Sequence, residues 1–136
     1  MSGGEDFFDT NVVLYLLSAD MAKADRAEEL LAVEGTISVQ VLNEFVAVAS
    51  RKLRMSWIEI RAVLARVRAG CAVEPLTVAP HARALRIAER YGIPIYDALV
   101  VSAALLANCK TLHSEDLQDG QVFERQLTVR NPFRSS

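Results

Sequence analysis

Short strand-like segments alternate with longer helix-like segments along this chain, and that order limits the folds it can adopt. Strands separated by helices pair in parallel and need cover on both faces. We therefore expect an α/β domain with a mostly parallel central sheet covered by helices on both faces. At 136 residues the chain has the size of one domain, which we assign to residues 1–136. The candidate strands are DFF, TISV, AVEPL, KTLHS and QLTV.

Local signals set the expected helix ends. Gly35 should end the second helix as a C-terminal glycine cap, and Gly92 should end the fifth in the same way. Ser56, followed three residues later by Glu59, predicts a capping box. Asp97 should cap the last helix, which is apolar nearly all round and therefore central. The expected helices cover residues 11–17, 23–34, 40–54, 56–69, 80–91 and 98–107.

Four carboxylates lie at the ends of these elements or on largely apolar ones: Asp9, Glu44, Asp97 and Asp116. Open α/β sheets gather such groups in one crevice beyond the carboxyl ends of their strands. Each acid alone also has a simpler interpretation. Asp9 and Asp97 suit helix caps, Glu44 suits an exposed residue paired with Arg51, and Asp116 suits a turn.

Carboxylates crowded together repel each other, and a divalent cation removes that penalty. An all-oxygen set favours Mg²⁺ or Mn²⁺. Zinc is disfavoured because His81 and His113 match no ligand spacing, and Cys71 and Cys109 form no CxxC motif. Metal-assisted hydrolysis of a phosphodiester is the chemistry that such a cluster suggests. The separated cysteines favour reduced thiols and a cytoplasmic protein.

Four stretches in order along nearly the whole chain carry a resemblance to a known family. They are FFDTNVVLYLL, TISVQVLNEFVAVASRK, GIPIYDALVVSAALLANC and LHSEDLQDG. The first ends a strand in Asp-Thr-Asn, the second carries a helical Glu, the third opens a small-residue helix with Asp, and the fourth contains Ser-x-Asp. With these motifs the chain resembles the PIN-domain nucleases, and within them the VapC-type toxins of bacterial toxin–antitoxin pairs.

The resemblance implies a metal-dependent endoribonuclease with an RNA substrate, an antitoxin partner and a homodimeric state. It assigns Asp9, Glu44, Asp97 and Asp116 to the catalytic pocket, the first, third and fourth as metal ligands. It also assigns Asn11 and Ser114 as supporting polar groups. Whether Glu115 or Asp119 joins the pocket stays open at this point.

Charge and hydropathy constrain the partners. Fifteen Lys and Arg against 17 Asp and Glu give a net charge of −2, so RNA must meet a local basic patch, for which Arg51, Lys52 and Arg54 are candidates. The longest apolar segment is too short to span a bilayer. On the helix from Ser56 to Val67, the side chains of Trp57, Ile60, Leu64 and Val67 recur near helical spacing. This face is expected either to pack into the core or to bind an antitoxin helix.

Two other functions compete with the nuclease. A PIN-like module can bind RNA or protein without cutting. An aspartyl-nucleophile phosphatase also places an Asp after its first strand, but its second Asp, the proton donor, is replaced here by Asn11.

Overall fold

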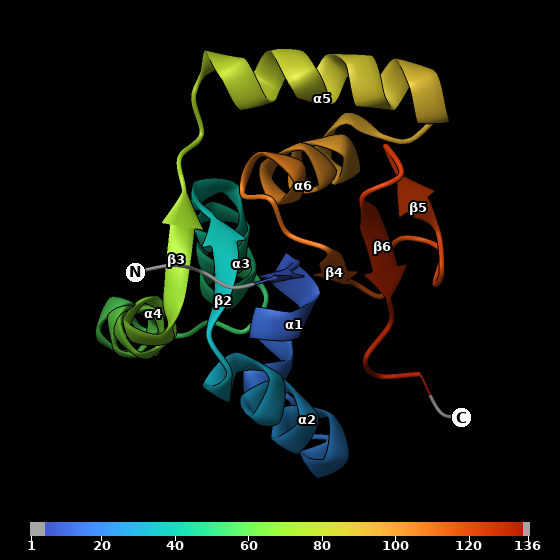
Figure 1. The fold of residues 1–136 in the computed structure, drawn as a ribbon. Coiled ribbons are helices and arrows are strands. Elements are labelled where there is room, and N and C mark those ends of the chain that lie inside the picture. Colours follow the sequence, from blue (N-terminus) through green and yellow to red (C-terminus); the bar gives the residue numbers. More distant parts are fainter. Residues whose placement is uncertain (1–4, 135–136) are drawn as a thin grey trace.

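The computed structural model describes residues 5–134, so the first four and last two residues of the expected 1–136 domain lie outside the described part. These residues form one six-stranded sheet in the order β3-β2-β1-β4-β6-β5, shown in Figure 1. The strands are β1 (Asp6–Phe8), β2 (Gly35–Ser38), β3 (Cys71–Glu74), β4 (Thr111–His113), β5 (Val122–Phe123) and β6 (Leu127–Arg130).

Every pairing in the sheet is parallel except that of β5 with β6. The mostly parallel α/β fold expected from the sequence is thus confirmed. The two-residue strand β5 was not anticipated, because Val122 and Phe123 are too few to show an alternating pattern.

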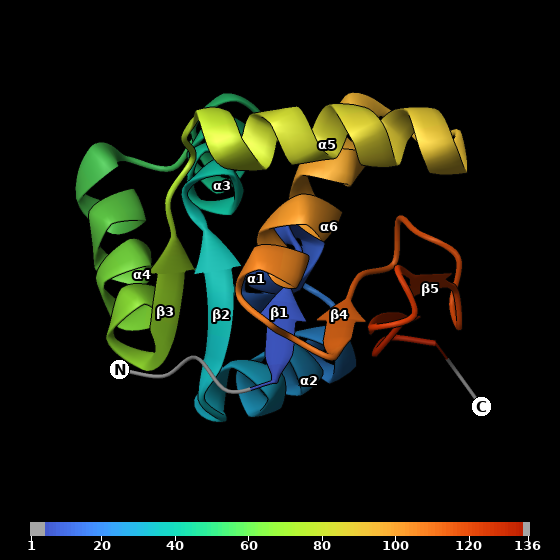
Figure 2. The ribbon, with the colours of Figure 1, turned by 45° about the horizontal axis from the view of Figure 1, so that its top comes forward.

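Helices cover the sheet from both sides. Figure 2 shows α6 in front of β1, while α1 and α2 lie behind the strands. The aromatic rings of Phe7, Phe8 and Phe45 are fully buried in the core between these layers. The helices are α1 (Thr10–Leu14) with the 3₁₀ turn η1 (Tyr15–Leu17), α2 (Met21–Ala32), α3 (Val39–Arg51), α4 (Trp57–Gly70), α5 (Val78–Tyr91) and α6 (Ile95–Leu106). Among residues 5–134, no helix combines the length and apolarity needed to cross a membrane.

Gly35 does not cap a helix, so that expectation was wrong. Helix α2 ends at Ala32, and Gly35 is the first residue of β2. A Cβ on Gly35 would lie 2.2 Å from Cε2 of Phe8, far inside van der Waals contact. The glycine therefore lets the Phe8 ring pack directly on the backbone of the neighbouring strand.

Other helix ends follow the sequence signals. Ser56 and Glu59 form the reciprocal capping box at the start of α4. Gly92 ends α5 in the left-handed conformation with φ of 66°. Residues with a side chain rarely adopt this left-handed conformation, which is why a glycine suits the end of α5.

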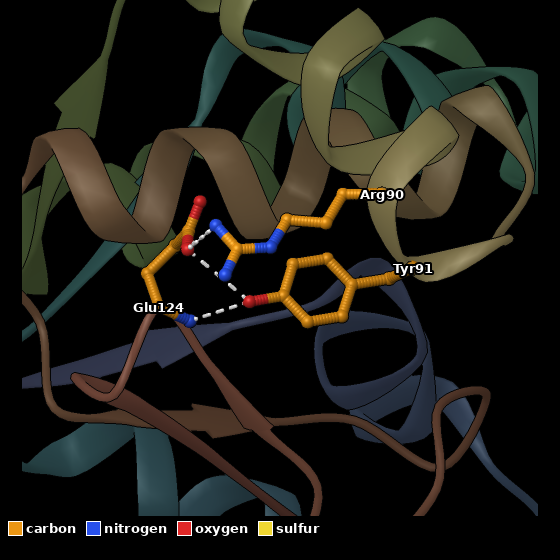
Figure 3. Close-up of polar contacts among 3 residues, drawn as sticks. All are labelled: Arg90, Tyr91 and Glu124. Carbon is orange, nitrogen blue, oxygen red and sulfur yellow. Dashed lines mark hydrogen bonds and ion pairs between the residues drawn. The ribbon is translucent and has the colours of Figure 1, made fainter.

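A hairpin turn joins β5 to β6 and is tied to α5. The Phe123 carbonyl accepts a hydrogen bond from the Gln126 N–H at 3.0 Å, and both intervening residues, Glu124 and Arg125, have positive φ. Figure 3 shows how Glu124 is held: its Oε2 lies 2.8 Å from Arg90 Nη1 and accepts from Tyr91 Oη at 3.2 Å. The Glu124 N–H donates to the same phenol oxygen at 2.9 Å.

Candidate active site

The candidate site lies between β1 and β4, where the order in which strands are added to the sheet reverses. From β1 the chain runs to β2 and β3 on one side, whereas β4 leads to β6 on the other. A parallel α/β sheet opens a crevice at such a switch point, beyond the carboxyl ends of the strands. Asp9 follows β1 directly and Ser114 follows β4 directly, so both lie at this crevice.

Asp9 is buried and fully hydrogen-bonded. Its Oδ1 accepts from the Thr10 N–H at 2.7 Å, which makes it the N-cap of α1. Its Oδ2 accepts from Ser114 Oγ at 2.7 Å. The cap interpretation of Asp9 is therefore correct, and the second oxygen still faces the end of β4.

Asn11 and Ser114 connect Asp9 to Asp116. Nδ2 of Asn11 lies 3.4 Å from Asp9 Oδ2 and 3.2 Å from Asp116 Oδ2, so one amide spans both carboxylates. Ser114 Oγ accepts from the Asp116 N–H at 3.1 Å while donating to Asp9. These two side chains fix the separation of the acids that follow β1 and β4.

Glu44 and the start of α6 are linked by Gln40, a residue that the sequence analysis missed. Gln40 Nε2 donates to Glu44 Oε1 at 2.7 Å and to the Tyr96 carbonyl at 3.3 Å. Glu44 thus bonds to Gln40 rather than pairing with Arg51. Gln40 is buried one turn before Glu44 on α3, and this i, i+4 spacing was the available signal.

Asp97 does not cap α6, contrary to expectation. Pro94 occupies the N-cap position, with ψ of 152°, and Asp97 lies in the first turn. Because its carboxylate is not used to cap the helix backbone, it stays available to the pocket, at the positive end of the helix dipole.

The charges of Asp116 and Glu44 act on both Asp9 and Asp97, so the four acids lie near one another. The pKa of Asp9 is raised from 3.8 to about 6. Burial raises it most and the charges of Asp116 and Glu44 add to this, while the hydrogen bonds from Ser114 and Thr10 lower it. Burial and then the same two charges raise the pKa of Asp97. None of the four acids forms an ion pair with a Lys, Arg or His within the described residues. The pocket therefore carries uncompensated negative charge.

This donor set fits a hard divalent cation. All of its groups are oxygens, and two buried amide oxygens, Asn11 Oδ1 and Gln40 Oε1, accept no hydrogen bond from residues 5–134. In that part of the chain no three acidic, His or Cys side chains converge closely enough to bind one ion directly. Mg²⁺ commonly takes only one or two carboxylates and completes its coordination with water and substrate phosphate.

Glu115 and Asp119, the other two acids of the loop after β4, bind other partners. The Tyr15 hydroxyl donates to Glu115. Asp119 accepts from the Asn131 N–H at 2.8 Å and from Arg134 Nη1 at 3.1 Å, contacts that lower its pKa, the backbone bond most. Of the three acids in this loop, Asp116 is the one bonded to Asn11.

His113 and the two cysteines are not suited to bind a metal ion in this pocket. His113 Nε2 lies 3.0 Å from Asp6 Oδ1 on the neighbouring strand, with its ring stacked on Phe8. Cys71 and Cys109 are free and buried, and burial raises the pKa of each thiol to about 11. Such thiols are poor nucleophiles and poor metal ligands at neutral pH.

Comparison with known proteins gives a consistent result. The family model described as PIN domain matches residues 7–121. A chain of a toxin–antitoxin complex from Klebsiella pneumoniae is 21% identical with a TM-score of 0.70, over 96% of this chain and 99% of that one. Mycobacterium tuberculosis VapC20, a sarcin–ricin loop cleaving toxin, is 22% identical with a TM-score of 0.63, over 79% of this chain and 86% of that one. At these identities the likeness to solved structures establishes the fold. No curated protein matches the chain significantly.

Proposed function

The chain belongs to the PIN domain family, and from that premise we propose that it is a divalent-metal-dependent ribonuclease acting as the toxin of a toxin–antitoxin pair. The supporting observation is the acidic pocket, in which Asp9, half-buried Glu44 and Asp97, and exposed Asp116 act on one another without a cationic partner among the described residues. Similarity of fold to a chain of a toxin–antitoxin complex and to a VapC toxin agrees with this role. We also propose that it acts on RNA in the cytoplasm.

Asp9, Asp97 and Asp116 are the residues that would hold the cation. Because no three acidic side chains among residues 5–134 converge closely enough to bind one ion directly, part of this coordination would run through bound water. Bound at this place, Mg²⁺ or Mn²⁺ would lower the pKa of a water molecule and would neutralise charge on the leaving oxygen of a phosphodiester. PIN-domain nucleases generally use divalent ions. Comparing RNA cleavage in Mg²⁺ with cleavage in Mn²⁺ distinguishes between the two metals.

The remaining polar residues hold these carboxylates in position. Ser114 and the Thr10 N–H fix both oxygens of Asp9. Asn11 keeps Asp116 at a set distance from Asp9, and Gln40 directs Glu44 toward the start of α6. Glu44, half-buried and hydrogen-bonded, is suited to orient or deprotonate the attacking water.

The two alternatives lack such support. An aspartyl phosphatase needs a proton donor two residues after its nucleophile, and Asn11 instead donates an amide hydrogen toward Asp9. A non-cleaving module would not need four uncompensated acids in one pocket, because crowding them costs stability.

Cleavage by the purified protein tests the proposal. A panel of single-stranded and structured RNAs is incubated with Mg²⁺ or Mn²⁺, with and without EDTA. We expect metal-dependent cleavage that EDTA abolishes and that Asp97→Asn lowers severely. Absence of cleavage with every RNA and both metals would favour the binding module, and hydrolysis of a phosphomonoester alone would favour the phosphatase.

The loop after β4 supplies matched controls. Asp116→Asn should lower the cleavage rate at saturating Mn²⁺ far more than Glu115→Gln or Asp119→Asn, because these two acids contact Tyr15 and Asn131 instead. A larger loss at Asp119 would contradict the assignment of the fourth acid.

We also propose that the antitoxin binds a groove of about 270 Å³ between η1, α2 and α4. Its lining is mostly aliphatic, with Glu28 and Arg66 among the lining residues, which suits an amphipathic helix. The groove lies further along α4 than Trp57, which is exposed and outside the lining. The homodimer implied by the VapC-type resemblance is a separate proposal that light scattering after size exclusion can test.

A further inference from the structure

A second, basic pocket lies between the start of α2 and the segment after β6. It encloses about 290 Å³ and has Lys23, Arg26, Phe133 and Arg134 in its lining. Asp20 is the acidic residue of that lining, and its Oδ1 is already used to cap α2 through the Ala22 and Lys23 N–H groups. In Figure 1 the chain after β6 descends toward α2, on the side away from α5.

This basic pocket is connected to the acidic site through Tyr15. The Tyr15 hydroxyl donates to Glu115, the residue directly before Asp116. Lys23 Nζ lies 3.4 Å from Tyr15 Oη and 4.9 Å from the centroid of its ring. The Tyr15 ring in turn packs on Phe133 at a centroid distance of 4.3 Å. Tyr15 thus links the loop that carries Asp116 to the basic pocket.

The cations of the pocket keep free hydrogen-bonding capacity. Arg26 uses Nε for the Pro132 carbonyl at 3.2 Å and Nη1 for an exposed contact with Glu29 at 3.5 Å. Arg134 uses Nη1 for Asp119 at 3.1 Å. A guanidinium has five N–H donors, and exposed ion pairs of this kind contribute little free energy. A phosphate can therefore bind both arginines without breaking a costly contact.

The composition of the pocket matches single-stranded RNA. Cations meet phosphates and aromatic rings stack on bases, and Tyr15 and Phe133 lie beside Lys23, Arg26 and Arg134. A protein of net charge −2 whose cleavage site is acidic needs a local positive site to hold a polyanion. The basic patch at Arg51, Lys52 and Arg54 has no aromatic ring among the contacts described here.

We propose that the basic pocket binds a phosphate and the adjoining base of the RNA strand, beside the phosphodiester held at the acidic site. The proposal rests on the RNA substrate of the proposed function and specifies which side of the acidic site the strand follows. Arg26 and Arg134 bind the phosphate, Lys23 adds charge, and Phe133 supports the base.

Binding in EDTA tests the pocket without turnover. Anisotropy of a labelled single-stranded RNA of roughly 12 nucleotides is measured with the full-length protein over a series of salt concentrations. Each neutralised phosphate contributes about −0.7 to the slope of log affinity against log salt. Because Arg26 and Arg134 bind the same phosphate, Arg26→Gln/Arg134→Gln should lower the magnitude of the slope by about 0.7 and weaken binding roughly tenfold. Phe133→Leu should weaken binding while leaving the slope unchanged.

Three controls make the result decisive. Arg26→Lys/Arg134→Lys should restore the salt slope, because the charge is kept. Arg86→Gln, an exposed loss of charge on α5, should change neither quantity. An unchanged slope in Arg26→Gln/Arg134→Gln would overturn the proposal, as would a loss of antitoxin binding with RNA binding intact. If the magnitude of the salt slope falls with Arg51→Gln/Lys52→Gln instead, the RNA strand follows the side of the acidic site at the end of α3.

The two proposals fail separately. Because the binding measurement needs no cleavage, an inactive wild-type protein that binds RNA through Arg26 and Arg134 would refute the nuclease alone. Metal-dependent cleavage with full binding by the double Gln variant would refute the basic pocket alone.

Discussion

Asp9→Asn should stabilise the protein when no divalent cation is bound. In the folded state burial first, and then the charges of Asp116 and Glu44, raise the Asp9 pKa from 3.8 to about 6. Below pH 3.8 the carboxyl is protonated in both the folded and the unfolded state and costs nothing. As pH rises from 3.8 to about 6, the unfolded chain releases this proton while the folded protein keeps it, so stability falls, and the loss is complete once the folded protein also ionises above about 6.

The size of the effect follows from that shift. About two pKa units at about 1.36 kcal/mol each give about 3 kcal/mol at pH 8. Asn keeps the bond from the Thr10 N–H, but it replaces the bond from the Ser114 hydroxyl with a weaker one, at a cost of about 1 kcal/mol. We therefore expect a net gain of about 2 kcal/mol in the free energy of unfolding at pH 8.

Urea unfolding in EDTA at pH 4 and pH 8 measures this gain. The difference between variant and wild type should be near zero or slightly negative at pH 4 and positive at pH 8. Saturating Mg²⁺ or Mn²⁺ should shrink it, since the cation compensates the wild-type charge. An Asp9→Asn protein that is no more stable than wild type at pH 8 in EDTA, with the same denaturant slope, would refute the reasoning.

Asp119→Asn is the matched control, because its pKa shift has the opposite sign. The Asn131 N–H lowers the pKa of Asp119, so its stabilising contribution is present above the unfolded pKa and is lost as pH falls. This variant should therefore be less stable than wild type at pH 8 and lose the difference in acid.

Four further results are expected. Mg²⁺ or Mn²⁺ should raise the melting temperature of the wild type by mass action, and a variant lacking the charges of Asp9, Glu44, Asp97 and Asp116 should lose that response; an unchanged response would place the ion elsewhere. Gly35→Ala should destabilise by about 2 kcal/mol or more through the clash with Phe8, whereas Gly70→Ala, where a Cβ would have only ordinary contacts, should be neutral or stabilising in thermal melts. Arg125→Gly should raise stability by about 1 kcal/mol by relieving its positive φ of 58°, and a loss would mean that the Arg125 side chain contributes more than its backbone costs. Val63→Glu should weaken co-purification with the antitoxin while Trp57→Gln does not, and the reverse would move the interface toward the exposed start of α4.

Sequence reasoning succeeded where a residue acts on its own neighbours. The capping box of Ser56 and Glu59 and the left-handed Gly92 are local, so their signals are complete within a few residues. The same holds for the alternation of strands and helices, which predicted the parallel sheet.

It failed where a distant residue decides the outcome. Gly35 looks like a helix cap in sequence, yet the ring of Phe8 on the neighbouring strand explains it. Asp97 looks like a helix cap as well, but Pro94 already begins the helix. Gln40, Tyr15 and the basic pocket depend on contacts across 56 to 106 residues, which no local pattern reveals.

The bond from Ser114 to Asp9 joins residues 105 positions apart, and the Ser114 N–H is itself held by the Arg130 carbonyl at the end of β6. During synthesis, Asp9 and Asn11 leave the ribosome well before Ser114 and Asp116, to which they are hydrogen-bonded. The hydrogen bonds that hold Asp9 therefore cannot all form on a nascent chain until β4 and β6 have emerged and paired. For the proposed nuclease, this order would delay RNA cutting until late in each round of synthesis, and the proposed antitoxin, made in the same interval, could meet the enzyme as soon as it assembles.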